Sequence, residues 1–117
     1  TIALTLALSS CATKQFPTDR EGGEKVCVVV ENHHFNSVKI YAERDGVRHR
    51  LGTVEGLTTE DIRIPHRVLA GAWNFRLVAN PIASSETVGT HGLEKIPGCH
   101  IHWHLAPNLY ASQVSIR

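Results

Sequence analysis

Residues 38–54, VKIYAERDGVRHRLGTV, contain the clearest β-strand pattern in this chain. Its first half alternates: Val38, Ile40 and Ala42 are apolar, while the residues between them are Lys, Tyr and Glu. Successive side chains of a β-strand point to opposite faces, so this alternation predicts a strand with one buried and one solvated face.

The pair Asp45-Gly46 divides this stretch into two halves. Both central positions of a type I′ turn need positive φ, which Asp and Gly tolerate. We therefore predict a β-hairpin formed by residues 38–44 and 47–54.

Similar short runs, rich in Val, Ile and aromatic residues, continue on both sides of the hairpin. Gly, Asn, Pro and Asp separate them, and none has sustained helical periodicity. We predict seven strands, at residues 25–31, 37–44, 47–54, 58–64, 72–79, 99–105 and 110–117. About seven short strands predict an all-β fold, an immunoglobulin-like β-sandwich formed by residues 25–117. A small α+β domain is the alternative, and no helical pattern supports it.

The fifth and sixth predicted strands supply the aromatic part of the core. Alternation in the fifth places four apolar side chains on one face: Trp73, Phe75, Leu77 and Ala79. Alternation in the sixth does the same for Cys99, Ile101, Trp103 and Leu105. We expect these two faces to pack against each other.

The N-terminal residues 1–10, TIALTLALSS, are apolar and uncharged, which is typical of a membrane-targeting signal. With Cys11 they end in Leu-Ser-Ser-Cys, a quartet similar to the lipobox in which the cysteine of a bacterial lipoprotein carries the lipid. A retained membrane anchor is the rival interpretation. Both place the domain on the periplasmic side of a bacterial membrane, with membrane contact through residues 1–11.

Residues 11–24 separate the leader from the predicted domain. They are polar and contain Pro17 and the pair Gly22-Gly23. This composition predicts a flexible tether.

The overall charge argues against nucleic acid as a partner. Lys and Arg number 12 and Asp and Glu number 11, which gives a net charge of +1; nucleic-acid-binding domains usually carry a strongly basic face. The sequence also lacks glycine-rich phosphate loops, H-E-x-x-H and G-x-S-x-G, and a small sandwich has little room for a deep pocket. We predict a protein that is not an enzyme and needs no cofactor.

Two of the three cysteines, Cys27 and Cys99, fall in the first and sixth predicted strands. In an oxidising compartment we predict that they form a disulfide, which leaves Cys11 as the odd cysteine. The alternative is two small buried residues that do not meet.

Residues 98–105, GCHIHWHL, carry the most chemically suggestive pattern. His100, His102 and His104 share the face opposite the core, and a pair spaced i, i+2 can bind Zn²⁺ or Cu²⁺. Three in a row span about 13 Å, so one ion cannot use all of them. No carboxylate or thiol stands at a sequence spacing that completes a site. Five further histidines are available without a predicted position: His33, His34, His49, His66 and His91.

Three interpretations of this row stay open. It is a polar row that faces solvent or a partner, a metal site with His100, His102 and His104 as ligands, or a pH-sensitive interface.

Five segments together resemble small predicted lipoproteins of environmental bacteria: residues 30–32 (VEN), 38–41 (VKIY), 46–54 (GVRHRLGTV), 62–65 (IRIP) and 75–82 (FRLVANPI). The resemblance covers residues 26–117 and implies a fold rather than an activity. The histidine row and the cysteine pair are not part of it.

These observations favour a membrane-tethered periplasmic accessory or scaffolding subunit that binds integral or peripheral subunits of a membrane protein complex. A chain whose apolar leader stays with its domain looks like a subunit of such a complex. One candidate is a photosynthetic reaction-centre–light-harvesting assembly. The alternative function is a periplasmic Zn- or Cu-binding β-sandwich protein that uses His100, His102 and His104.

Overall fold

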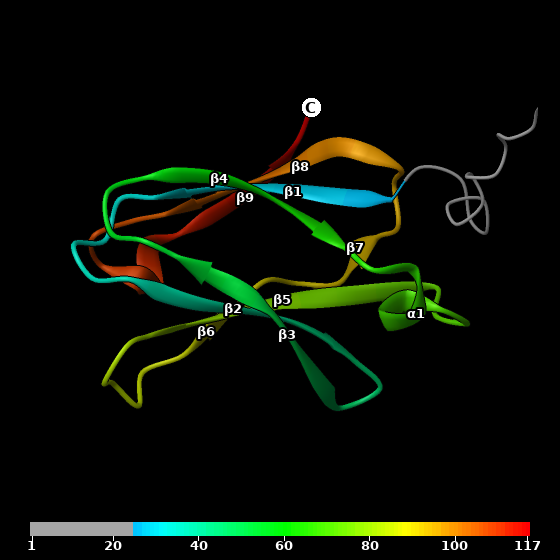
Figure 1. The fold of residues 1–117 in the computed structure, drawn as a ribbon, viewed down its shortest axis with the longest axis horizontal. Coiled ribbons are helices and arrows are strands. Elements are labelled where there is room, and N and C mark those ends of the chain that lie inside the picture. The colour runs from blue at the N-terminus through cyan, green and yellow to red at the C-terminus, as the bar shows by residue number, and fades with distance from the viewer. Residues whose placement is uncertain (1–24) are drawn as a thin grey trace, which may run out of the picture.

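The computed structural model describes residues 25–117, which form two β-sheets packed face to face (Figure 1). The four-stranded sheet contains, in spatial order, β4 (Thr59–Ile64), β1 (Val26–Asn32), β8 (Gly98–Leu105) and β9 (Gln113–Ile116). The five-stranded sheet contains β3 (Val47–Val54), β2 (Val38–Arg44), β5 (Asn74–Pro81) and β6 (Val88–Gly89), and β7 (Leu93–Glu94) pairs with β5. The predicted all-β sandwich is confirmed.

The strand count differs from the prediction. All seven predicted strands are present with slightly shifted ends, but the described part of the chain contains nine. The two additional strands, β6 and β7, have two residues each, too few for any alternation to be recognised in the sequence. A four-residue helix, α1 (His66–Leu69), and a 3₁₀ turn, η3 (Leu109–Ala111), join other strands.

The predicted hairpin between β2 and β3 is confirmed. Asp45 and Gly46 have φ values of 53° and 80°, and Arg44 pairs with Val47. The turn therefore has positive φ at both central positions, as a type I′ turn requires.

The strand β1 lies at the centre of the four-stranded sheet, antiparallel to β4 and parallel to β8. The register with β8 shifts at its start: Val26 lies opposite Gly98, but Val28 lies opposite Ile101. Two residues of β8 therefore face the single residue between Val26 and Val28, which is a β-bulge. The bulge interrupts the alternation before Ile101, so Cys99 and His100 are both exposed while Ile101 is buried.

The core lies between the two sheets, and the predicted inner face of β8 is confirmed. Ile101 and Leu105 are fully buried and Trp103 is 2% exposed. Phe75, Leu77 and Ala79 of β5 are buried as well.

Two core predictions are wrong. Trp73 is 91% exposed, because it precedes the first residue of β5 and follows a turn in which Gly71 has a φ of 77°. Cys99 is also exposed instead of packing with Trp103, because the bulge turns it to the outer face.

The two ends of the sandwich carry different loops (Figure 1). The β2–β3 hairpin and α1 lie toward the end where β1 begins. At the opposite end, backbone hydrogen bonds join the loop after β1 to two neighbours. The His33 N–H donates to the carbonyl of Leu105 at the end of β8 at 2.8 Å, and the Leu57 N–H donates to the His34 carbonyl at 3.1 Å.

The predicted leader (residues 1–10), lipidation site (Cys11) and tether (11–24) lie outside the described residues. Within residues 25–117, none of the helices has the length and apolar character that crossing a membrane requires.

Candidate functional site

The outer face of the four-stranded sheet carries the predicted cysteine pair and the predicted histidine row. Across β1 and β8, Glu31 lies beside His104 and Val29 lies beside His102. On the other side of β8, these two histidines lie beside Gln113 and Ser115 of β9. The face is therefore mostly polar, in contrast to the apolar face that packs on the second sheet.

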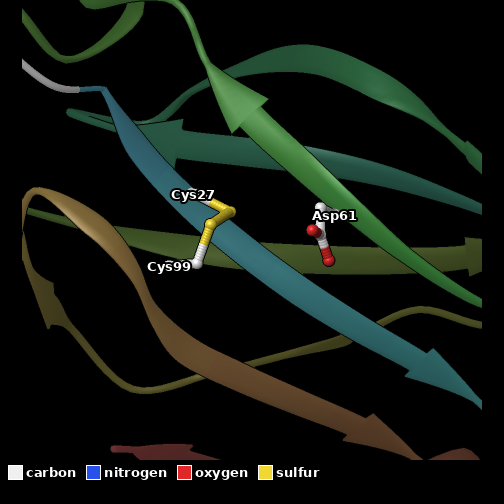
Figure 2. A group of neighbouring side chains, drawn as sticks. All are labelled: Cys27, Asp61 and Cys99. Carbon is white, nitrogen blue, oxygen red and sulfur yellow. A yellow bond between two sulfur atoms is a disulfide. The ribbon is translucent and has the colours of Figure 1, made fainter.

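The predicted disulfide is present at one end of this face (Figure 2). Cys27 and Cys99 are joined with an S–S distance of 2.07 Å and a Cα–Cα distance of 4.3 Å. It links the adjacent parallel strands β1 and β8, on the outer face rather than in the core between the sheets.

Asp61 of β4 lies next to the disulfide (Figure 2). One carboxylate oxygen and the two sulfur atoms all lie within 4.8 Å of one another. Cysteine binds metals as the thiolate, which a disulfide does not offer. This trio is therefore not a metal site while the disulfide is intact.

The three histidines of the row have different surroundings. The Nδ1 atom of His100 lies 2.7 Å from the carbonyl oxygen of Arg117. The Nδ1 atom of His102 is buried and has no hydrogen-bond partner among the described residues. Of the three, within residues 25–117, only His104 joins a cluster of metal-ligating atoms.

That cluster contains Glu31, His33 and His104, and its ligand atoms all lie within 4.8 Å of one another. The Oε1 atom of Glu31 lies 3.5 Å from Nδ1 of His104 and 3.7 Å from Nε2 of His33. The two imidazole rings are stacked, with centroids 4.3 Å apart and planes 25° from parallel. Both histidine side chains are about half exposed, so the cluster is open to solvent.

Glu31 is not among the ligands predicted from the sequence, and His33 has no predicted position. The cluster depends on the parallel register of β1 with β8, which joins segments far apart in the chain. One local signal was available: His33 follows Glu31 by two residues, so both lie on the same side of the strand and its extension.

Asn32 fixes the loop that carries His33. Its side chain is 2% exposed, and its amide donates to the carbonyl oxygens of Asn36, Val54 and Glu55 at 3.1–3.2 Å. Its side-chain oxygen accepts a 3.0 Å hydrogen bond from the His34 N–H. Together with the bond from the His33 N–H to the Leu105 carbonyl, these contacts hold His33 beside the end of β8.

The other histidines do not join this cluster. His34 is buried, and its Nδ1 accepts a hydrogen bond from the Asn36 N–H at 3.1 Å, which shapes the loop. His91 contacts the Gly92 carbonyl through Nδ1 at 2.8 Å. His49 lies in β3 and His66 in α1.

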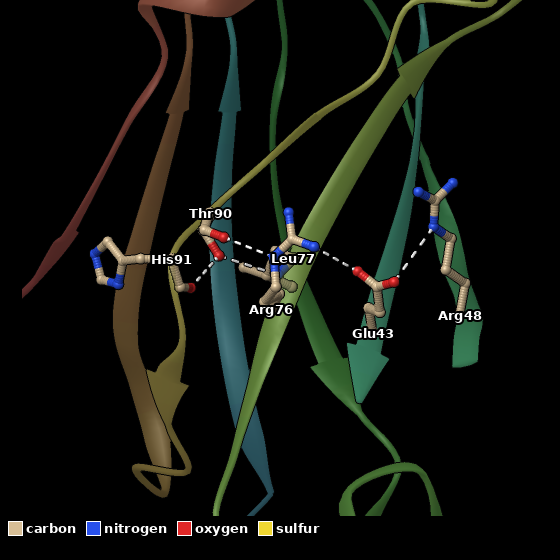
Figure 3. Close-up of polar contacts among 6 residues, drawn as sticks. All are labelled: Glu43, Arg48, Arg76, Leu77, Thr90 and His91. Carbon is tan, nitrogen blue, oxygen red and sulfur yellow. Dashed lines mark hydrogen bonds and ion pairs between the residues drawn. The ribbon is translucent and has the colours of Figure 1, made fainter. Parts of the chain in front are cut away.

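A separate polar network lies over the five-stranded sheet (Figure 3). Arg76 donates from Nη1 to Glu43 at 2.7 Å and from Nε to the Thr90 carbonyl at 2.9 Å, while Arg48 lies 3.9 Å from the other oxygen of Glu43. The Thr90 hydroxyl accepts from the Leu77 N–H and donates to the His91 carbonyl. These polar groups bind one another, so the network fastens the segment around the short β6 onto β5 and β2.

A groove of about 610 Å³ lies beside β6 and β9. Its lining includes the apolar residues Val88, Trp103 and Leu109 together with polar Thr90, His91 and Gln113. This volume falls in the range of ligand pockets. The small size of the domain had predicted little room for a pocket.

No family model matches the chain, and no curated protein matches its sequence. Among solved structures, the chain is similar to the NMR structure of a protein from Eubacterium rectale, at 17% sequence identity and a TM-score of 0.47. The alignment covers 85% of this chain and 94% of that chain.

Proposed function

We propose that the protein is a non-enzymatic binding domain held on the periplasmic side of a bacterial membrane, as an accessory or scaffolding subunit of a membrane protein complex. The observation that carries the proposal is the Cys27–Cys99 disulfide on the outer face of the sheet. Disulfides persist in oxidising compartments and are rare in the cytosol. The leader at residues 1–10 and the lipobox-like end at Cys11 agree with export.

The arrangement of the ends supports a tethered orientation. The predicted tether joins the domain at the start of β1. The loops that contain Phe35, Leu57 and Tyr110 follow β1, β3 and β8 and lie at the opposite end of the sandwich. These three side chains are 73%, 69% and 72% exposed. These exposed apolar side chains are available for contact with a partner at the end of the domain away from the tether.

Cell fractionation and intact mass test the location. The full chain expressed in a bacterium with two membranes is expected in the membrane fraction with Cys27 and Cys99 oxidised. Loss of residues 1–10 with added lipid at Cys11 identifies a lipoprotein, and an unshortened chain identifies a retained anchor. A Cys11→Ser variant prevents lipidation and leaves the Cys27–Cys99 disulfide intact. A cytoplasmic protein with reduced cysteines overturns the proposal.

Co-purification from native membranes tests the scaffolding role. We expect the full chain to carry defined membrane subunits with it, and mass spectrometry of those subunits decides whether the complex is photosynthetic, which stays a prediction.

Deletion of residues 1–24, with export by another cleavable signal, is expected to release a folded domain, because the tether raises its local concentration at the partner. Retention of the truncated domain at full occupancy contradicts the role of the tether. Failure of the full chain to carry any subunit overturns the accessory function.

A further inference from the structure

We propose that Glu31, His33 and His104 form a binding site for one divalent transition-metal ion, with Zn²⁺ as the reference ion. This site goes beyond the proposed function and does not depend on the tether or on a partner. It uses one histidine of the row that the sequence singles out, together with two residues from β1 and the loop after it.

The first support is the spacing of the ligand atoms. Zn²⁺ binds imidazole nitrogen and carboxylate oxygen at about 2.0–2.2 Å, so two neighbouring ligands of a tetrahedral site lie about 3.4 Å apart. The carboxylate oxygen of Glu31 lies 3.5 Å from the nitrogen of His104 and 3.7 Å from that of His33. Both distances exceed the usual hydrogen-bond length of about 2.9 Å. The two oxygen–nitrogen distances match the spacing of ligands around one ion, and the two nitrogens lie within 4.8 Å of each other.

The second support is the strand geometry. Residues i and i+2 of one strand are about 6.6 Å apart, whereas neighbours on adjacent strands are separated by about 4.8 Å. Glu31 and His104 are such neighbours across β1 and β8, so they lie closer than successive histidines of the row. His33 joins them because its backbone is hydrogen-bonded to Leu105.

The third support is the chemistry of the set. Two imidazoles and one carboxylate suit first-row divalent ions, Zn²⁺ and Cu²⁺ among them, and the carboxylate offsets part of the ionic charge. The half-exposed histidine side chains leave room for water as a further ligand and for entry of the ion. Asn32 holds the backbone of the loop through four hydrogen bonds. Binding then requires the two imidazole rings to rotate out of their stacked arrangement so that their nitrogen lone pairs converge on the ion.

Calorimetric titration with ZnCl₂ tests the site. The full chain is used in detergent micelles, with the disulfide intact and without a polyhistidine tag, which would itself bind zinc. We expect one equivalent of Zn²⁺ to bind, and EDTA to reverse the binding. Each of the variants Glu31→Gln, His33→Gln and His104→Gln should weaken binding at least about tenfold, because each removes a ligand. The matched control is His100→Gln, which removes a histidine from the same strand and face but outside the cluster.

Nuclear magnetic resonance of the histidine rings provides the second measurement. Zn²⁺ should shift the imidazole signals of His33 and His104 and leave those of His91 and His100 in place. His33 lies outside the strands, so its substitution should not disturb the sheet. If a strand variant fails to unfold cooperatively, zinc binding by the His33→Gln variant tests the site instead. Absence of stoichiometric binding overturns the proposal. So does equal weakening by His100→Gln and His104→Gln, or unchanged binding in a folded His33→Gln variant.

Discussion

Two tryptophans in this chain show how one residue type takes opposite roles. Trp103 is 2% exposed between the sheets, whereas Trp73 is 91% exposed on a turn. Removing a buried indole loses its burial and leaves a cavity, but removing an exposed one does neither.

We therefore expect Trp103→Ala to lower the free energy of unfolding by about 3–5 kcal/mol. Trp73→Ala, the matched control, should change it by no more than about 0.5 kcal/mol. Urea unfolding of both variants measures this difference. A stable Trp103→Ala protein would show that the inner and outer faces of β8 are assigned the wrong way round.

Asn32 is a buried polar residue whose side chain joins two segments, the loop after β1 and the end of β3 with the loop that follows it. Asn32→Ala removes the partner of the His34 N–H and of three carbonyl groups, of which the bond to Val54 is buried, so we expect a loss of about 2–4 kcal/mol in the free energy of unfolding. Asn74→Ala at an exposed position is the control, with an expected change within about 0.5 kcal/mol. Equal effects of the two substitutions in chemical denaturation would contradict the anchoring role of Asn32.

At the scale of elements, β1 and β8 are joined at one end by the disulfide, and the glutamate–histidine cluster lies at the other end. The disulfide closes a long loop, since its cysteines are separated by 72 residues in the sequence. The chain-entropy treatment assigns such a loop a stabilisation of about 4 kcal/mol, because the cross-link restricts the unfolded chain.

The double variant Cys27→Ala/Cys99→Ala is accordingly expected to unfold at lower denaturant, with a free energy reduced by up to about 4 kcal/mol. Dithiothreitol should destabilise the native protein and leave the double variant unchanged. A native protein whose unfolding midpoint ignores the reductant would show that this cross-link contributes little to stability.

Some strands can be predicted from the sequence much better than others. Alternation and the Asp45-Gly46 turn locate β2 and β3 well, because both signals are local. The two-residue strands β6 and β7 are too short to have a pattern of their own. Hydrogen bonds of Thr90 with Arg76 and Leu77 hold the segment beside β6 in place. The two cysteines predict the disulfide. They do not predict that it lies on the outer face of the four-stranded sheet, because this depends on the bulge in β8. The pairing of Glu31 with His104 depends on a register between distant strands, which no local pattern encodes.

At the scale of the whole molecule, the strands divide into central and peripheral groups. β1, β2, β5 and β8 each have a neighbouring strand on both sides, whereas β6 and β7 contribute two residues each. The free energy of the local unfolding that exposes an amide group is highest in core strands, which are hydrogen-bonded to a neighbouring strand on each side.

We expect amide hydrogen exchange to be slowest in the four central strands and fast in β6 and β7. Exchange followed by mass spectrometry or magnetic resonance measures this order. Protection of Val88 and Gly89 equal to that of Leu77 would contradict it and would show that the Arg76 network makes β6 part of the cooperative core.

The parallel pairing of β1 with β8 also determines when the domain can be completed. β1 is synthesised early, but one of its two neighbours consists of residues 98–105. A nascent chain that has reached β4 therefore leaves the other edge of β1 open until almost all of the domain has been made. Contacts between such distant segments form slowly, because a long loop must close first. The covalent link between Cys27 and Cys99 then keeps the first strand of the domain beside its last long strand, so a partial unfolding that separates β1 from β8 can be reversed without a new search by the chain.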